Sequence, residues 1–225
     1  PLFKRVSDKL NLREGKNPEV FELGVKEVIQ LPKGRGVEGE VIHTLGFPLT
    51  KGIGGTFIYG LPDDQIIIGL CAYLDTADPL LDPHRELQKL KTHPYFQEKL
   101  AGGEVIAYGG KTLPAGGWYS MPKLYHNGML VAGDAASMVD VKKLKGVHLA
   151  MRAGTLAGET AFDAVSNGDF TEKTLASYDE KIQNSLVKEE LWKTRNFHQT
   201  ITKGVFLSAP EVAFQEVFGG AGMFG

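Results

Sequence analysis

The sequence predicts a fold of the α+β or α/β class, in which an antiparallel sheet is followed by a strand–loop–helix unit and further helices. Four short apolar segments lie between residues 21 and 73, each bounded by turn residues, which is typical of antiparallel strands. An apolar run at 129–132 ends in Gly-Asp and precedes an Ala-rich segment, as expected of a buried strand of a parallel sheet and its crossover helix. Residues 171–195 repeat apolar side chains at the spacing of an amphipathic helix.

The first third of the chain is predicted to form one helix and four strands. Residues 2–12 place apolar side chains at helical spacing. The segment Leu61-Pro62-Asp63-Asp64 suits a turn, because Pro and Asp favour tight turns. We therefore expect an antiparallel meander whose strands cover residues 21–31, 41–47, 55–59 and 65–73.

The rest of the chain is predicted to be mainly helical. A helix starts at Asp82-Pro83, since Pro fits the first helical turn. It runs to about residue 90, and it is followed by a short helix at 95–100, a strand at 105–108, and helices at 146–165 and 171–195. The expected domains are a substrate-type sheet domain at 1–125, a returning strand and helix of a cofactor domain at 126–168, and a C-terminal helical, partly apolar segment at 169–225.

The composition limits the classes of function. A formal net charge of −2 gives no electrostatic case for binding nucleic acid. Cys71 is the single cysteine, so these 225 residues can form neither an internal disulfide nor a four-cysteine iron–sulfur site.

The strongest candidate site combines Gly133, Asp134 and the helix that opens at Gly146. Ligands of open α/β sheets bind beyond the carboxyl ends of the strands, where Asp134 is expected. Its carboxylate can accept hydrogen bonds from a sugar or ribityl hydroxyl, while the helix start offers free N–H groups to an anion or a carbonyl oxygen. The alternative is an ordinary crossover with a solvated Asp.

One expected motif is missing. A dinucleotide site opens with a βαβ unit and the motif G-x-G-x-x-G, and neither occurs before residue 40. We therefore expect the chain to lack the amino-terminal part of such a site.

Several segments resemble a known family in the same order along the chain. They include HTLGFPL at 43–49 and GGTFIY at 54–59. The others lie at 11–13, 24–27, 106–110, 116–117, 121–124, 145–148, 150–154, 190–191 and 195–196. Together they resemble electron-transfer flavoprotein–ubiquinone oxidoreductase and its bacterial FixC-type relatives over nearly the whole chain.

The resemblance implies a two-domain flavoprotein of the p-hydroxybenzoate-hydroxylase type, with a Rossmann-like FAD domain and a sheet domain that binds quinone. Such an FAD-dependent oxidoreductase passes electrons from electron-transfer flavoprotein to a membrane quinone. No side chain of this chain is expected to act as a nucleophile.

The resemblance also assigns roles to residues. Asp134 would hydrogen-bond the ribityl chain of FAD, and Gly133 would let the backbone approach it. The N–H groups of Lys145, Gly146 and Val147 would lie under the pyrimidine carbonyl of the flavin.

A second set of residues is assigned to the quinone. Gly54 and Gly55 match a glycine pair that lines the quinone headgroup, although Ile53 stands where the family usually carries an aromatic residue. Without the resemblance, the glycine pair would indicate a β-bulge or a bend in a strand.

The resemblance further implies that the chain is an internal fragment, inactive alone, without the FAD motif and the 4Fe–4S domain of its relatives. FixC-type systems carry that cluster on a ferredoxin-like partner. We expect peripheral attachment to a membrane surface, on the cytoplasmic side in a prokaryote or on the mitochondrial inner membrane in a eukaryote.

Two alternatives remain. A geranylgeranyl-reductase-like flavoprotein would share the fold and the Gly-Asp strand, although residues 43–49 and 54–59 argue against it. A catalytically inactive binding module is the other alternative.

Overall fold

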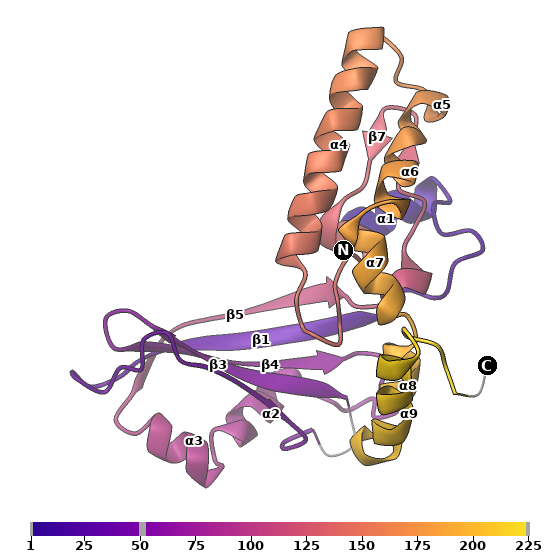
Figure 1. The fold of residues 1–225 in the computed structure, drawn as a ribbon. Coiled ribbons are helices and arrows are strands. Elements are labelled where there is room, and N and C mark those ends of the chain that lie inside the picture. Colours follow the sequence, from indigo (N-terminus) through magenta and orange to yellow (C-terminus); the bar gives the residue numbers. More distant parts are fainter. Residues whose placement is uncertain (1, 50–52, 224–225) are drawn as a thin grey trace. The chain divides into compact units, whose positions relative to one another are not determined.

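The computed structural model describes residues 2–49 and 53–223 of the chain. The chain forms two compact units, one of residues 21–113 and the other of residues 1–20 together with 114–225. Figure 1 shows the elements of both units. These two units divide the chain differently from the predicted domains 1–125, 126–168 and 169–225. The predicted roles of those domains stay predictions.

Residues 21–113 form a five-stranded sheet flanked by two short helices. The strands are β1 (Phe21–Gln30), β2 (Val41–Leu45), β3 (Gly54–Leu61), β4 (Gln65–Tyr73) and β5 (Glu104–Pro114), and they lie in the order β2-β3-β4-β1-β5. The pairs β2–β3, β3–β4 and β4–β1 are antiparallel, so the predicted antiparallel strands are present. The predicted meander is wrong for β1, which lies between β4 and β5 and not beside β2. β5 is longer than the predicted strand at 105–108, because Gly109 and Gly110 continue the strand instead of ending it.

One face of this sheet forms the core of the unit. Ile66, Ile68 and Leu70 alternate along β4 and are all fully buried. They pack with apolar residues of α2 (Pro83–Leu90) and α3 (Pro94–Lys99). Asp82 caps α2 by accepting hydrogen bonds from the next helical amides, which fixes the start of that helix where the sequence predicts it.

A charged group is also buried on this face. Glu27 of β1 accepts hydrogen bonds from Lys91 Nζ at 2.6 Å and from Gln88 Nε2 at 2.8 Å. Burial raises the pKa of this carboxyl, but the hydrogen bonds from Lys91 and Gln88 outweigh that effect and hold it below its usual value. Glu27 therefore ties the segment after α2 to the sheet.

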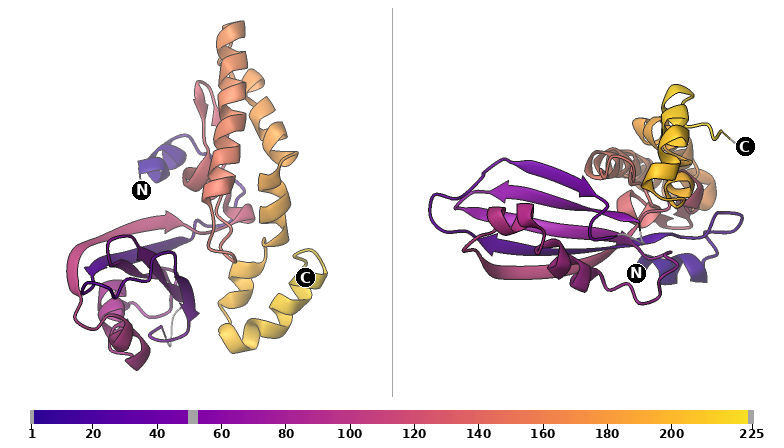
Figure 2. Two further views of the ribbon diagram at one scale, coloured as in Figure 1. Left: turned by 60° about the vertical axis from the view of Figure 1, so that its left-hand side comes forward. Right: turned by 90° about the horizontal axis from the view of Figure 1, so that it is seen from below.

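The second unit is helical, with a core along α4 (Val147–Asn167). Leu149, Ala153 and Leu156 of α4 are buried against the other helices of the unit. Figure 2 shows α4 beside α6 (Ser177–Gln183) and α7 (Leu186–Lys193), whose buried residues include Tyr178 and Ile182. The buried face of α4 therefore recurs every three or four residues, as an amphipathic helix requires.

The single helix predicted over 171–195 is wrong. The segment forms α5 (Glu172–Leu175), α6 and α7. The break before α7 lies at Ser185, whose hydroxyl accepts a hydrogen bond from the amide of Val187 at 3.2 Å and starts a new helix. After the break Val187 is buried, whereas Leu186, which continues the spacing of Tyr178 and Ile182, is 42% exposed, so the apolar stripe shifts by one residue.

The strand predicted at 129–132 is shorter and paired differently. β7 (Met129–Leu130) pairs antiparallel with β6 (Tyr125–His126), and among the described residues it has no parallel neighbour. A 3-10 turn, η2 (Gly133–Ala136), follows immediately. The apolar run therefore marks burial correctly, but not the type of pairing.

The remaining helices are α1 (Leu2–Lys9), η1 (Trp118–Ser120), α8 (Phe197–Ile201) and α9 (Val205–Val217). Arg195 and Asn196 donate to the carbonyls of Gly219 and Gly220 at 2.8 and 2.9 Å, which fastens the segment after α9 to the end of α7. Within residues 2–49 and 53–223, no helix combines the length and apolarity needed to span a bilayer.

Candidate functional site

The first group of predicted site residues lies at η2 and the start of α4. Gly133 has φ +64°, a left-handed conformation that favours glycine. It is buried, and a Cβ added there would lie 3.2 Å from Cβ of Ala150 on α4. Gly133 therefore allows the turn after β7 to pack closely against α4.

Asp134 lies beside the start of that helix. Its side chain is exposed, and Oδ1 lies 3.5 Å from the position that a Cβ on Gly146 would occupy. Gly146 is the N-cap of α4, and no side chain among the described residues caps the helix there. The structure thus brings Asp134 and Gly146 together, as the sequence predicts.

The start of α4 is accessible as well as uncapped. Lys145 and Val147 are both exposed on either side of Gly146. The first N–H groups of a helix have no partner within the helix, and their dipole favours negative charge nearby. α4 has 21 residues, so this dipole is fully developed. The amide of Lys145 is already bonded to the carbonyl of Asp140 at 3.2 Å, so the free donors are those of Gly146 and Val147. An exposed carboxylate beside these two amides can accept a polyol hydroxyl while the amides donate to a carbonyl oxygen, the pair of groups that a ribityl chain and a pyrimidine ring present.

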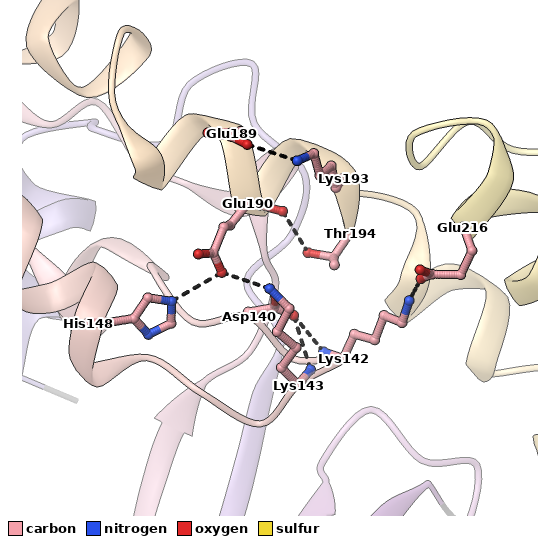
Figure 3. Close-up of polar contacts among 9 residues, drawn as sticks. All are labelled: Asp140, Lys142, Lys143, His148, Glu189, Glu190, Lys193, Thr194 and Glu216. Atoms are coloured by element: carbon pink, nitrogen blue, oxygen red, sulfur yellow. Dashed lines mark hydrogen bonds and ion pairs between the residues drawn. The ribbon is translucent and has the colours of Figure 1, made fainter.

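The loop before α4 contains residues that sequence reasoning missed. Asp140 is fully buried, and its Oδ1 accepts hydrogen bonds from the amides of Lys142 and Lys143, each at 3.1 Å. Figure 3 shows that Lys143 and His148 both point to Glu190 of α7. The Asp-x-x-Lys spacing could have indicated a side-chain-stabilised turn, but no local signal indicates a partner 47 residues away.

The two glycines of the predicted quinone site lie on opposite faces of the sheet. Gly54 pairs with Ala72 of the buried face, and a Cβ on it would lie 2.1 Å from the carbonyl oxygen of Cys71. Close packing alone therefore requires a glycine at position 54. Gly55 pairs with Cys71 on the other face, where an added Cβ would meet nothing nearer than 3.3 Å.

Gly55 belongs to a row of small residues across that open face. Cys71 pairs with Gly55 on one side and with Gly24 of β1 on the other, so the three positions point the same way. We call this row, Gly55–Cys71–Gly24, the small-residue row. A cavity of about 420 Å³ lies over its Cys71 and Gly24 end.

The walls of the cavity come from the neighbouring strands. Phe57 of β3 packs over Gly69 of β4, and Lys26 of β1 borders the cavity. Gly110 and Leu113 of β5 close the far side. The cavity therefore has a flat floor with an aromatic wall and two lysines, Lys26 and Lys111, in its lining, which suits a flat apolar ring with polar substituents.

The surroundings of this face favour the protonated forms of two groups, the Cys71 thiol and the Tyr59 hydroxyl. Burial, with a smaller effect of Glu22, raises the pKa of the Cys71 thiol to about 11. Burial and then Cys71 raise the pKa of Tyr59, whose hydroxyl lies 3.2 Å from Nε2 of His43. Cys71 is therefore a neutral apolar lining at physiological pH. In the part of the chain that the structure describes, no cluster of His, Cys, Asp or Glu could hold a metal ion.

Comparison with known families agrees with the division into units. The family described as "ETF-QO, ubiquinone-binding" matches residues 21–113, the same residues that form the sheet unit. The small-residue row and its cavity lie wholly within the matched segment.

Two relatives match nearly the whole chain. The mitochondrial electron transfer flavoprotein-ubiquinone oxidoreductase of Arabidopsis thaliana is 39% identical over 207 residues, which cover 91% of this chain and 32% of that protein. A probable electron transfer flavoprotein-ubiquinone oxidoreductase of Acinetobacter baylyi is 34% identical over 220 residues, which cover 90% of this chain and 39% of that protein. The chain thus spans about a third of the length of these relatives.

Solved structures show the same fold at low sequence identity. A geranylgeranyl bacteriochlorophyll reductase-like protein of Thermoplasma acidophilum has a TM-score of 0.67 and 12% identity, over 88% of this chain and 47% of that one. A flavoprotein/dehydrogenase of Cytophaga hutchinsonii has a TM-score of 0.56 and 16% identity, over 96% of this chain and 53% of that one. The predicted α+β class is confirmed, and the fold is one that flavoproteins share.

Residues 21–113 thus match the ubiquinone-binding family, and over about nine tenths of its length the chain is similar to electron transfer flavoprotein-ubiquinone oxidoreductases.

Proposed function

We propose that the chain supplies the quinone-binding sheet and part of the flavin site of an FAD-dependent oxidoreductase that passes electrons from electron-transfer flavoprotein to a membrane quinone. The observation that supports this most is the cavity beside the small-residue row, because it lies inside the segment that matches the ubiquinone-binding family. Cys71 and Gly24 leave a flat floor for the quinone ring, and Phe57 offers it an aromatic wall. Gly55 does not line the cavity itself but continues the same row beside Cys71.

In this proposal Gly54 has a packing role, while Gly55 contacts the quinone. Lys26 in the lining can donate a hydrogen bond to a ring oxygen. Because burial keeps the Cys71 thiol protonated, it adds no negative charge where a quinone would gain electrons.

The second part of the proposal concerns the flavin. Asp134 accepts hydrogen bonds from the ribityl chain, with Gly133 allowing the close approach of the backbone. The amides of Gly146 and Val147 at the start of α4 donate to the pyrimidine carbonyl and favour negative charge on the ring, while the amide of Lys145 stays bonded to the carbonyl of Asp140. When bound, FAD supplies the electron-transfer chemistry, and these residues only bind and orient it.

Three partners are also proposed. Electron-transfer flavoprotein is the electron donor. The 4Fe–4S cluster belongs to a further domain or a ferredoxin-like partner, because Cys71 alone cannot ligate it. We propose no nucleic-acid partner.

The third partner is a membrane surface. Leu207, Val217 and Phe218, in or next to α9, are 79%, 76% and 57% exposed. Such side chains can enter the interface of a bilayer without spanning it. Peripheral attachment would be to the cytoplasmic side in a prokaryote or to the mitochondrial inner membrane in a eukaryote.

Quinone binding to the chain itself tests the first part of the proposal. A short-chain ubiquinone should shift the backbone amide NMR signals of Gly24, Gly55 and Cys71. Gly55→Leu should abolish these shifts, whereas Tyr108→Ala on the exposed edge strand β5 should leave them unchanged. Shifts confined to other parts of the chain, or none at millimolar quinone, would refute the quinone site.

Electron flow tests the second part. With the amino-terminal part of a family member added, FAD bound to the chain should bleach with reduced electron-transfer flavoprotein and recover its colour with a short-chain ubiquinone. Bleaching by NADPH with an isoprenoid acceptor would instead support a geranylgeranyl-reductase-like activity, although the similarity to the Thermoplasma protein shows only the fold. A chain that binds no flavin, even with the amino-terminal part of a family member added, would support an inactive binding module.

A further inference from the structure

The loop that leads into α4 closes on itself. The amide of Asp140 donates to the carbonyl of Lys145 at 2.9 Å, and the amide of Lys145 donates back to the carbonyl of Asp140 at 3.2 Å. The buried carboxylate of Asp140 accepts from the amides of Lys142 and Lys143 within the loop. The loop is therefore a small rigid turn, and Gly146 follows directly after it.

Glu190 of α7 holds this turn from outside. Lys143 Nζ donates to Oε2 of Glu190 at 2.8 Å, and the same nitrogen lies 3.4 Å from Oδ2 of Asp140. Nε2 of His148 lies 3.1 Å from the same oxygen of Glu190 (Figure 3). One carboxylate oxygen thus contacts a residue three positions before Gly146 and a residue two positions after it.

This ion pair is partly shielded at its acidic end, while the Lys143 side chain is 54% exposed. The Glu190 side chain is 17% exposed, so solvent screens it less than a fully exposed pair. The hydrogen bond from Lys143 outweighs burial and lowers the pKa of Glu190, and the hydrogen bond to Glu190 raises the pKa of Lys143. Both groups therefore stay charged across the neutral range.

The neighbouring residue offers a contrast on the same helix. Glu189 is 62% exposed, and within the part of the chain that the structure describes it pairs with Lys193 alone, one turn along α7, at 2.9 Å. Such an exposed pair within a helix contributes little, and it touches neither the loop nor α4. The contact with the loop therefore depends on the position of Glu190 along α7, and not simply on the presence of a glutamate in this helix.

We propose that Glu190 is a positioning residue, which fixes the amide end of α4 by holding Lys143 and His148 on either side of Gly146. This inference rests on the proposed function, because that amide end is the proposed seat of the flavin pyrimidine ring. Glu190 does not touch the flavin. It sets the direction in which the free N–H groups of α4 point and restricts their motion, and hydrogen-bond donors must be fixed in this way to act on a ligand without reorganising.

The test uses the whole chain and two readouts. In Glu190→Gln the side chain keeps its size but loses its charge. Since a hydrogen bond between charged groups is stronger than a neutral one, hydrogen exchange at the amides of Lys145 and Ala150 should accelerate about tenfold. The same substitution should weaken the binding of FMN, measured by fluorescence quenching, by about three- to tenfold. Glu189→Gln should change neither quantity.

A double-mutant cycle separates positioning from a general loss of stability. Lys143→Met alone should reproduce part of the effect, and Lys143→Met with Glu190→Gln should be less damaging than the sum of the two. His148→Ala, at a side chain that is 42% exposed, supplies a variant that leaves the core intact. It should accelerate exchange at Ala150 more than at Lys145.

The outcomes distinguish this inference from the proposed function. Equal exchange in Glu190→Gln and Glu189→Gln, or additive effects in the cycle, would overturn the positioning role whether or not FMN binds. If exchange behaves as expected but the unaltered chain binds no FMN, the helix is positioned and the assignment of a flavin to it fails. If FMN binds equally well to all variants, Glu190 does not position the flavin site.

Discussion

Replacing Gly54 and Gly55 by alanine, one at a time, tests the register and the two faces of the sheet. A methyl group on Gly54 would lie 2.1 Å from the carbonyl oxygen of Cys71 and 2.5 Å from Cδ1 of Leu49. Contacts of this kind are ordinary at 3.4–4 Å, so the backbones of β3 and β4 would have to separate by more than an ångström. A methyl group on Gly55 would meet the carbonyl oxygen of Thr44 at 3.3 Å, which a small shift relieves.

The magnitudes follow from these distances. Overpacking costs about 1–3 kcal/mol, and the clash at Gly54 belongs at the upper end because a backbone atom must move. Replacing glycine by alanine within a strand returns roughly 0.5–1 kcal/mol. The free energy of unfolding of Gly54→Ala should therefore fall by about 2 kcal/mol, which lowers Tm by roughly 4–8 °C in a chain of this size. Gly55→Ala should stay within about 0.5 kcal/mol of the unaltered chain.

The assay is urea unfolding of the full chain, followed by circular dichroism, together with quinone titration of each folded variant. Gly55→Ala should remain folded and bind ubiquinone more weakly, because the added methyl rises from the small-residue row. A reversed order of stability, with Gly55→Ala the more damaging, would mean that the strand pairing is slipped by one residue. Equal stability of both variants would refute the close packing at Gly54.

Three further predictions concern single groups. Gly133→Ala should lower the free energy of unfolding by about 1–2 kcal/mol, because alanine must adopt φ +64° and meet Ala150; unchanged thermal unfolding would contradict this. The pKa of Glu27 is lowered in the folded state, so its stabilising contact with Lys91 is present above the ordinary carboxyl pKa and is lost as pH falls through the lowered value. Unfolding midpoints measured from about pH 6 to pH 3 should therefore drop more steeply in the unaltered chain than in Glu27→Gln, and parallel curves would refute the contact. With a thiol pKa of about 11, Cys71 should react with iodoacetamide at pH 8 roughly two orders of magnitude more slowly than a free cysteine, and a rate equal to that of the urea-unfolded chain would show that the thiol is not buried.

Much of the sheet could be predicted from the sequence because its signals are local. Alternating apolar residues and the turn at Pro62-Asp63 determine where β3 and β4 begin and end, and the structure has them there. The extension of β5 through Gly109 and Gly110 could not be foreseen, since glycines usually end strands and only pairing with a neighbouring strand keeps them extended.

The helical unit was harder to predict, because its details depend on contacts that are distant in sequence. The apolar spacing before Ser185 continues almost in phase after it, so periodicity alone suggests one helix; the cap at Ser185 and the burial of Val187 decide otherwise. In the same way, the short apolar run ending at Leu130 signals burial but not the strand with which it pairs.

For the candidate site, Asp134 and Gly146 could be singled out from the sequence, because Asp134 follows a predicted strand and Gly146 begins a predicted helix. Sequence reasoning could not find Glu190, whose partners lie more than 40 residues earlier in the chain. It also treated Gly54 and Gly55 as one feature, although the pleat of a strand sends neighbouring residues to opposite faces.

The chain leaves the helical unit after residue 20 and returns to it at residue 114, and these two points lie close together. The amide of Ala115 donates to the carbonyl of Val20 at 2.8 Å, so the residues that flank positions 21–113 are hydrogen-bonded to each other. A segment whose two ends adjoin behaves as a cassette, because a short linker can close the gap that its removal leaves. Evolution or an engineer can therefore exchange the sheet unit by grafting at these two positions, while the helical unit keeps its own connectivity.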